Sequence, residues 1–187
     1  MPRDEQLWDW LGEPLAVDFA NTVRRSGWNY RELLNTGRDV ASWSRHERDR
    51  VPALTAELAE TRLDEIRAVR DDGFGLLLAA AGGGAPPADA VRRINARARE
   101  RPVVAQLPDG RRPSAKIVLG DPDPVDELLA RVAAAAIELS TAPSSGLALC
   151  DAPSCGQFFL RERPNQRWCG PACGTRARVA RHAVHRG

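Results

Sequence analysis

The chain has 187 residues, of which 43% are apolar and 28% charged, so it can bury a core and wholesale disorder is excluded. The longest uncharged stretch, 73–88, contains five glycines and two prolines, and it is too short and too broken for a membrane-spanning helix of about 20 apolar residues. The polar N-terminus has no apolar core behind it, which predicts no signal peptide and hence a cytoplasmic protein.

Positive charge is concentrated at the C-terminal end. Residues 1–149 carry 20 Lys and Arg against 23 Asp and Glu, a net charge of −3. Residues 150–187 carry 7 arginines against 2 acids, a net charge of +5, and all four cysteines lie in this tail. Because local charge density governs attraction to a polyanion, the tail is the candidate nucleic-acid-binding part.

The first part of the chain, 1–145, is predicted to be mostly helical. Residues 15–23 alternate enough for a short strand or a strand-to-turn element that ends in a turn at Asn21 and Thr22. A short helix is expected over 39–45, and a longer one from Pro52 to about Asp71. Glycines at 73 and 75 interrupt the longer helix, although 76–81 could continue it in a kinked form.

After a glycine- and proline-rich loop at 82–87, the pattern predicts a helix over 88–100. Residues 102–107 and 114–119 flank a turn at 108–110 and indicate a β-hairpin. Asp123 is a good N-cap for a last helix that runs to about Ser140. The connector 141–146 is short enough to let the tail pack on the first part. The expected fold class is therefore α+β, a mostly helical domain with a short sheet or hairpin, followed by a small module at 146–187.

The four cysteines form two local pairs with thirteen residues between them: Cys150 with Cys155, and Cys169 with Cys173. In a cytosolic chain this spacing indicates one four-thiolate Zn²⁺ site rather than disulfides. Four thiolates close the coordination sphere, as in structural zinc sites. The alternatives are four ordinary buried cysteines, a catalytic zinc, or a site in which His182 and His185 replace one cysteine pair.

The local order around these pairs predicts a treble clef. The first pair lies on a tight loop, residues 157–160 form a strand, residues 163–165 turn, and residues 166–168 lead back as the second half of a hairpin. The second pair then begins a helix at Pro171, in which the i, i+4 spacing puts both sulfurs on one face.

Basic side chains follow the second pair at helical spacing. Arg178, Arg181, His182 and His185 form one stripe, with Arg176 to one side, and Arg161, Arg163 and Arg167 lie on the predicted hairpin. The planar guanidinium matches both phosphate oxygens and guanine edges, so we expect the stripe to bind DNA, with RNA as a second partner. The alternative is a solvated basic face.

The motif Trp168-Cys169-x3-Cys173-Gly174-x-Arg176, followed by an arginine-rich helix, resembles the bacterial CGNR zinc finger. The front of the chain resembles its usual partner, the ABATE domain, at residues 15–22, residues 63–66 and the Ile94-Asn95 pair. The resemblance implies a transcription regulator whose finger contacts nucleic acid. Thr175 stands where the name-giving asparagine belongs, which leaves the metal ligands untouched; threonine still hydrogen-bonds, with a shorter reach.

The front domain shows no recognisable catalytic set, so we expect no enzyme activity. Its single histidine, His46, lies in a charged run, and no glycine-rich phosphate loop follows a strand. Asp18 with Asn21 could mark a ligand cleft, and hydrogen bonding within a turn is the alternative role. The expected protein is a zinc-dependent DNA-binding transcription regulator whose front domain senses a small-molecule effector or a partner, or forms a homodimer. The alternative is a zinc-stabilised protein-interaction or RNA-binding module.

Overall fold

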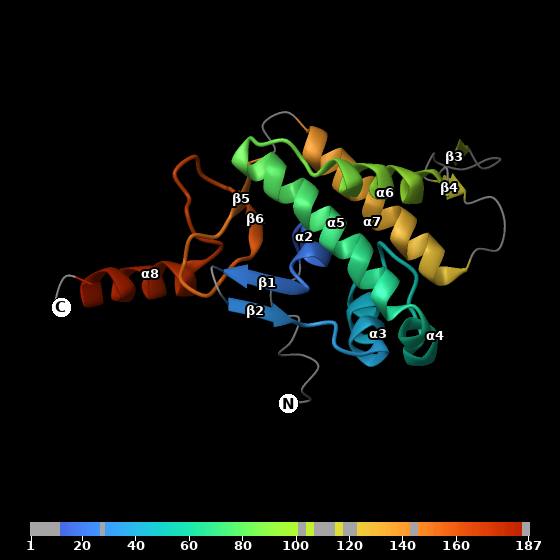
Figure 1. Cartoon of the computed structure of the whole chain (residues 1–187), viewed down its shortest axis with the longest axis horizontal. Coiled ribbons are helices and arrows are strands. Elements are labelled where there is room, and N and C mark those ends of the chain that lie inside the picture. Colours follow the sequence, from blue (N-terminus) through green and yellow to red (C-terminus); the bar gives the residue numbers. More distant parts are fainter. Residues whose placement is uncertain are drawn as a thin grey trace.

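The computed structural model describes residues 12–26, 29–100, 104–106, 115–117, 123–142 and 146–184. Helices dominate the front part, and the long helix α5 runs through its centre with α2, α6 and α7 packed against it (Figure 1). The helices are α2 (Leu15–Ala20), α3 (Gly37–His46), α4 (Ala56–Thr61), α5 (Leu63–Gly82), α6 (Ala88–Arg99), α7 (Pro124–Thr141) and α8 (Pro171–Val184). In the described ranges, none of the helices is long and apolar enough to cross a membrane.

Three two-stranded antiparallel sheets complete the described part of the chain. They pair β1 (Val23–Ser26) with β2 (Asn29–Glu32), β3 (Val104–Gln106) with β4 (Ala115–Ile117), and β5 (Leu147–Leu149) with β6 (Phe158–Leu160). The β3–β4 pair confirms the hairpin predicted between the helix over 88–100 and the last helix, and its turn at 108–110 lies outside the described residues. The mostly helical α+β class predicted from the sequence is confirmed.

Capping residues begin two of the predicted helices: Asp123 as expected for α7, and Thr36 for α3, which starts two residues before the predicted start at Asp39. At α3, the Thr36 hydroxyl accepts from the Asp39 backbone N–H, and the Asp39 carboxylate accepts from the Thr36 N–H, a reciprocal capping box. At α7, the Asp123 carboxylate accepts from the N–H groups of Val125 and Asp126, at 2.8 and 3.2 Å. Each cap satisfies backbone donors that the first helical turn leaves unpaired.

Two sequence expectations for the front part are wrong. Residues 15–20 form helix α2 rather than a strand. Because residues 16–20 are all buried, their hydrophobicity follows neither the period of a helix nor that of a strand. The long helix breaks at Arg62 and then continues through Gly73 and Gly75 to Gly82. A Cβ on Gly75 would make ordinary contact with the Pro87 ring, so this glycine lies against the following loop within a continuous helix.

The C-terminal module packs on the front part. Leu147 of β5 and Phe158 of β6 belong to the same buried cluster as Val17, Phe74 and Leu77. The rings of Phe74 and Phe158 meet edge to face with centroids 4.8 Å apart. The short connector predicted to let the tail pack on the larger domain does so.

Polar contacts fix the same junction. The Asn21 side chain donates to the Phe158 carbonyl at 3.0 Å and accepts from the Phe158 N–H at 2.8 Å, so one amide satisfies both backbone groups of a buried strand residue. Gly156, at φ +67°, lies so close to β1 that a Cβ there would be 2.1 Å from the Arg25 carbonyl oxygen. Only glycine fits both this φ and this approach.

Candidate metal centre

A single tight turn between β5 and β6 brings the first cysteine pair together. Cys150 follows β5 and Cys155 precedes β6, and the turn between them is closed by the Cys155 N–H donating to the Ala152 carbonyl at 3.1 Å. Ser154 and Gly156 take left-handed φ values of 59° and 67° on either side of Cys155. Such positive φ values are typical of tight turns that aim a side chain inward.

The strand pairing around this turn differs from the prediction. β6 pairs with β5, which precedes the first cysteine, in the register Leu147↔Leu160 to Leu149↔Phe158. Residues 166–168 form no strand; instead the Arg167 carbonyl accepts from the Asp151 N–H at 3.2 Å. The predicted hairpin is wrong, because the sequence analysis assigned no element to residues 147–149, which form β5 and pair with β6. The treble-clef assignment stays a prediction.

The second pair is carried by the start of α8. Cys173 lies in the first turn of the helix and Cys169 lies just before it, one helical turn earlier. The ring of Trp168 covers this turn from the side, and a Cβ on Gly174 would be 3.4 Å from it. Three of the four cysteines are buried, and Cys169 is partly exposed.

The four sulfurs have the separations that tetrahedral zinc requires. All four Sγ atoms lie within 4.8 Å of one another, with Cys155 to Cys169 at 3.7 Å and Cys169 to Cys173 at 3.5 Å. Four sulfurs about 2.3 Å from a central ion define a tetrahedron with edges of about 3.8 Å. The cluster therefore fits one Zn²⁺ ion, as the cysteine spacing predicted.

The electrostatics of the cluster also favour a cation. Hydrogen bonds from the Cys155 and Cys169 thiols lower the pKa of Cys150 to about 2. The hydrogen bond to Cys150 raises the pKa of Cys155 to about 12. Hydrogen bonds to Cys150 and Cys155 likewise raise the pKa of Cys169. The close packing of Cys150, Cys155 and Cys169 therefore opposes their simultaneous ionisation, and a zinc ion between them would supply the compensating positive charge.

The competing ligand sets find no support in the described residues. His182 is exposed and follows Cys173 by nine residues, about 13 Å along a helix, whereas the four cysteines form a complete cluster by themselves. All four cysteines are unpaired, so there is no disulfide among them. His185 lies outside the described residues.

Family comparison agrees with this centre and with the domain order. The family model ABATE, described as "Putative stress-induced transcription regulator", matches residues 13–143. The chain belongs to the ABATE family. The model of the CGNR zinc finger matches residues 147–186, which contain all four cysteines. No curated protein matches the chain significantly.

Two further groups of the CGNR finger lie beside the sulfurs. The Arg176 guanidinium donates to the Cys173 Sγ at 3.1 Å, so a residue predicted to bind nucleic acid also lies against the metal site. Gln157, which the sequence analysis missed, is buried and places its side-chain carbonyl oxygen 3.7 Å from the Cys155 Sγ. Its position two residues after Cys155, in the turn that carries the first pair, is the signal that could have identified it.

The arginines predicted to bind nucleic acid divide into two groups. Arg161, Arg163 and Arg178 are exposed, and no carboxylate of the described residues pairs with them. Arg178 donates to the Thr175 hydroxyl at 3.0 Å, so the threonine that replaces the family asparagine positions a basic side chain. In the second group, Arg167 pairs with Asp151 at 3.0 Å, and Arg181 lies 6.0 Å from the centre of the Trp168 ring.

Asp18 and Asn21 of the ABATE domain serve the fold in the described structure. Asp18 is fully buried and accepts from the N–H groups of Gly12 and Glu13 and from the Arg50 guanidinium. Burial raises the pKa of Asp18, and the Arg50 hydrogen bond opposes that rise. A ligand would have to displace Arg50 to reach this carboxylate, and the ligand cleft stays a prediction.

Proposed function

We propose that this protein is a zinc-dependent DNA-binding regulator of transcription whose CGNR finger contacts the duplex. The observation that carries this proposal is the setting of α8. The helix is attached at its zinc-binding end and projects away from the front domain (Figure 1). Its exposed side chains, among them Arg178, Arg181 and His182, are therefore accessible to a large partner.

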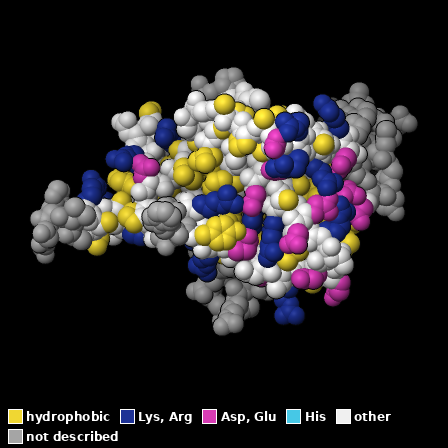
Figure 2. Space-filling model, in the orientation of Figure 1, with side chains coloured by type: hydrophobic (Ala, Val, Ile, Leu, Met, Phe, Trp, Pro, Cys, Tyr) yellow, Lys and Arg dark blue, Asp and Glu magenta, His cyan; other side chains and the backbone are white. Residues whose placement is uncertain are grey.

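The pairing of arginines differs between the two parts of the chain. Most described arginines of the ABATE domain have a carboxylate partner; these are Arg25, Arg50, Arg62, Arg67, Arg70, Arg92, Arg93, Arg97 and Arg131. Of the described finger arginines, Arg167 has one. In Figure 2, acidic and basic side chains interleave over the front domain, and acidic side chains are sparse over the finger. The finger thus keeps its positive charge available for an external anion.

The exposed face of α8 has the chemistry of a groove-binding helix. Arg178, Arg181 and His182 are exposed at i, i+3 and i+4, and Val179 beside them is 64% exposed. The major groove of B-DNA admits a helix, arginine recognises guanine edges and phosphates, and apolar side chains contact thymine methyl groups. Arg161 and Arg163 add charge in the loop that follows β6.

The salt dependence of duplex binding tests this proposal. Neutralising about five phosphates gives a slope of about −4 to −5 in a plot of log affinity against log salt concentration. Replacing Arg178 and Arg181 by alanine should make this negative slope less steep by about 2, because each phosphate contact contributes about 1 to its magnitude. The matched control replaces Arg45 and Arg48 of the α3 region, two exposed arginines without a carboxylate partner among the described residues. A flat salt response of the unaltered protein contradicts the proposal.

A groove on the finger supports the second candidate function, an RNA-binding or protein-interaction module. The groove has a volume of about 320 Å³ and is lined by Asp151, Pro153, Arg167, Trp168, Ala177, Ala180 and Arg181. An indole face beside guanidinium groups is suited to stacking an unpaired base. Stronger competition by single-stranded RNA than by duplex DNA for the same labelled site would favour this candidate.

For the ABATE domain we propose an input role, through an effector or self-association. A mostly apolar groove of about 270 Å³ lies between α5, α6 and α7, with Leu76, Val91 and Ile137 in its wall and Asn95 as a polar group. Concave apolar surfaces with few polar groups are typical of small-molecule sites. A thermal-shift screen of metabolites without a hit, together with a monomer in sedimentation, would contradict this role.

A further inference from the structure

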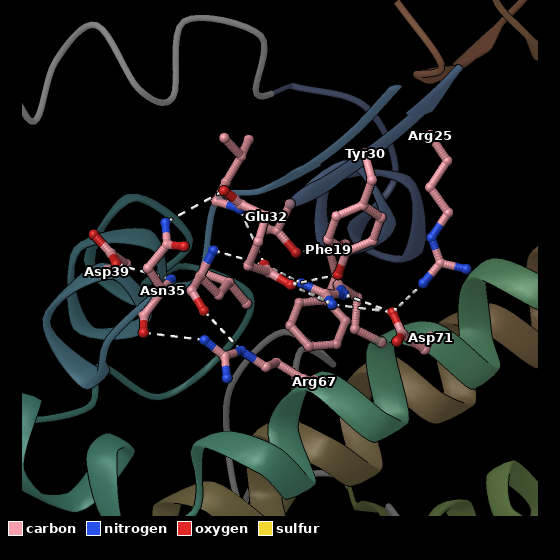
Figure 3. A network of polar contacts seen from close by, with 12 residues as sticks. Phe19, Arg25, Tyr30, Glu32, Asn35, Asp39, Arg67 and Asp71 are labelled. Carbon is pink, nitrogen blue, oxygen red and sulfur yellow. Dashed lines mark hydrogen bonds and ion pairs between the residues drawn. The ribbon is translucent and has the colours of Figure 1, made fainter. Parts of the chain in front are cut away.

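The β1–β2 ribbon of the front domain has two chemically different faces. Side chains alternate between the faces of a strand, and the register pairs Arg25 with Tyr30 and Arg24 with Arg31. Arg25 and Tyr30 point toward α5, where Arg25 forms an ion pair with Asp71 at 2.8 Å (Figure 3). Arg24 and Arg31 therefore lie on the opposite, outer face.

The inner face is neutralised and packed. The Arg25 guanidinium lies 4.7 Å from the centre of the Phe74 ring and also pairs with Asp71. Glu32, at the end of β2, accepts two hydrogen bonds from the buried Arg70, at 2.5 and 2.8 Å. Arg25 and Glu32, the charged residues of this face, thus each have a partner of opposite sign within the protein (Figure 3).

The outer face carries two positive charges that no carboxylate of the described residues compensates. Arg24 and Arg31 are directly opposite each other, and no acidic group of the described residues pairs with either of them. The Nε of Arg24 is buried and has no hydrogen-bond partner in the described part of the chain. Like charges directly opposite on a ribbon are destabilising, so this arrangement costs stability unless an anion binds there.

The ribbon is held next to the finger. Asn21, two residues before β1, binds both backbone groups of Phe158 in β6. Gly156, in the first cysteine turn, contacts the Arg25 backbone directly. The ribbon and the first cysteine turn of the finger are thus neighbours in a fixed relation.

We infer that Arg24 and Arg31 form a second contact surface for the phosphates of the same DNA duplex that the finger binds. This inference rests on the proposed function, and it makes the ABATE domain a direct participant in DNA binding. The two guanidiniums contact phosphate oxygens on one strand and position the duplex against α8. Phosphate contacts of this kind fix orientation and add affinity without reading sequence.

Duplex DNA fits this surface better than duplex RNA does. The major groove of B-DNA is about 12 Å wide and flanked by accessible phosphates, so a helix in the groove and a neighbouring ribbon can contact the same duplex. The major groove of A-form RNA is deep and narrow and does not admit a helix. A surface made of the ribbon and α8 together therefore selects the DNA form.

The test compares two double variants by salt-dependent binding to one duplex. Arg24→Ala with Arg31→Ala removes the outer pair, and Arg45→Ala with Arg48→Ala removes the same charge from the α3 region. The ribbon variant should make the negative log–log salt slope less steep by about 2, whereas the control should change its steepness by less than about 0.5. Arg24→Lys with Arg31→Lys should keep the slope of the unaltered protein, because lysine also neutralises phosphate.

Zinc content and the melting temperature of each variant are measured in parallel. We expect zinc content to be unchanged, and the melting temperature to stay the same or to rise because the like-charge pair is removed. If the ribbon and control variants have the same slope while the unaltered protein binds with a steep one, the ribbon inference is wrong and the finger proposal stands. If the unaltered protein shows no salt-dependent binding, the proposed function fails first. Equal effects of the ribbon variant on duplex DNA and duplex RNA would also overturn the inference.

Discussion

Replacing Asn21 by alanine tests whether finger and front domain form one cooperative unit. In the structure, its amide makes two buried hydrogen bonds to Phe158, of 2.8 and 3.0 Å. Alanine leaves the N–H and the carbonyl of Phe158 buried and unpaired between the β6 strand and the ABATE domain. The effect is therefore expected to exceed the loss of two ordinary surface hydrogen bonds.

The magnitude follows from the two unpaired groups. Each buried unsatisfied backbone group costs about 1–3 kcal/mol, so the free energy of unfolding should fall by about 2–6 kcal/mol. In a domain of this size, 1 kcal/mol lowers the melting temperature by about 2–4 °C, which gives a decrease of roughly 10 °C. The matched control is Asn35→Ala, which removes one exposed hydrogen bond of 3.3 Å to Glu32 and should cost less than about 1 kcal/mol.

Two probes followed during thermal unfolding test whether the finger and the front domain unfold together. A zinc-sensitive dye reports release of the metal from the finger, and circular dichroism reports loss of the helices, most of which lie in the front domain. We expect the two transitions to coincide in the unaltered protein and both to move down in the variant. A variant that melts within about 2 °C of the unaltered protein, or zinc release well separated from helix melting, would refute the coupling.

Three further substitutions have expected outcomes. Gly156→Ala should lower the stability by roughly 3 kcal/mol or more in chemical denaturation, because its Cβ would lie 2.1 Å from the Arg25 carbonyl oxygen at φ +67°. Arg176→Ala should weaken zinc binding about tenfold in competition with a chelating dye, because the guanidinium donates to a ligand sulfur. Glu32→Gln should cost about 3 kcal/mol at neutral pH, because it takes the main partner from the buried Arg70. Burial alone would raise the pKa of Glu32, but the Arg70 hydrogen bond and other donors outweigh it and lower this pKa. The stabilisation is therefore present above the ordinary pKa of 4.5 and is lost as pH falls through the lowered value.

Each of these substitutions has a control or a contradicting result. Gly170→Ala introduces a Cβ with no atom within 4 Å and should be close to neutral, so an equal loss in both glycine variants would contradict the steric argument. Arg178→Ala should leave zinc affinity unchanged, which separates a charge effect at the sulfurs from a general loss of positive charge. For Glu32→Gln, a stability difference that stays constant down to about pH 3 would contradict the assigned ionisation.

The parts of the fold that depend on local sequence were predictable. Asp123 caps α7 and the glycine- and proline-rich loop ends α5, because these signals act on the backbone within a few residues. The cysteine cluster was predictable for the same reason, since each pair is local and zinc requires only that the two pairs meet.

The parts that depend on distant contacts were not predictable. Helix α2 is buried on all sides, so its sequence carries no periodicity, and its neighbours across the core favour the helix. Asn21 was predicted as a turn or cleft residue, whereas its partner, Phe158, lies 137 positions away. The pairing of β6 with β5 likewise joins residues on both sides of the first cysteine pair. Such contacts leave no signal within a short window of sequence.

The most direct test of the account is binding of one labelled duplex by three forms of the protein: as purified with its metal, after removal of the metal by a chelator, and after addition of one equivalent of Zn²⁺. The account predicts one zinc per chain in the first form, loss of salt-dependent binding in the second, and full recovery in the third. Equal DNA affinity of the metal-free form, or purified protein without zinc, would contradict it.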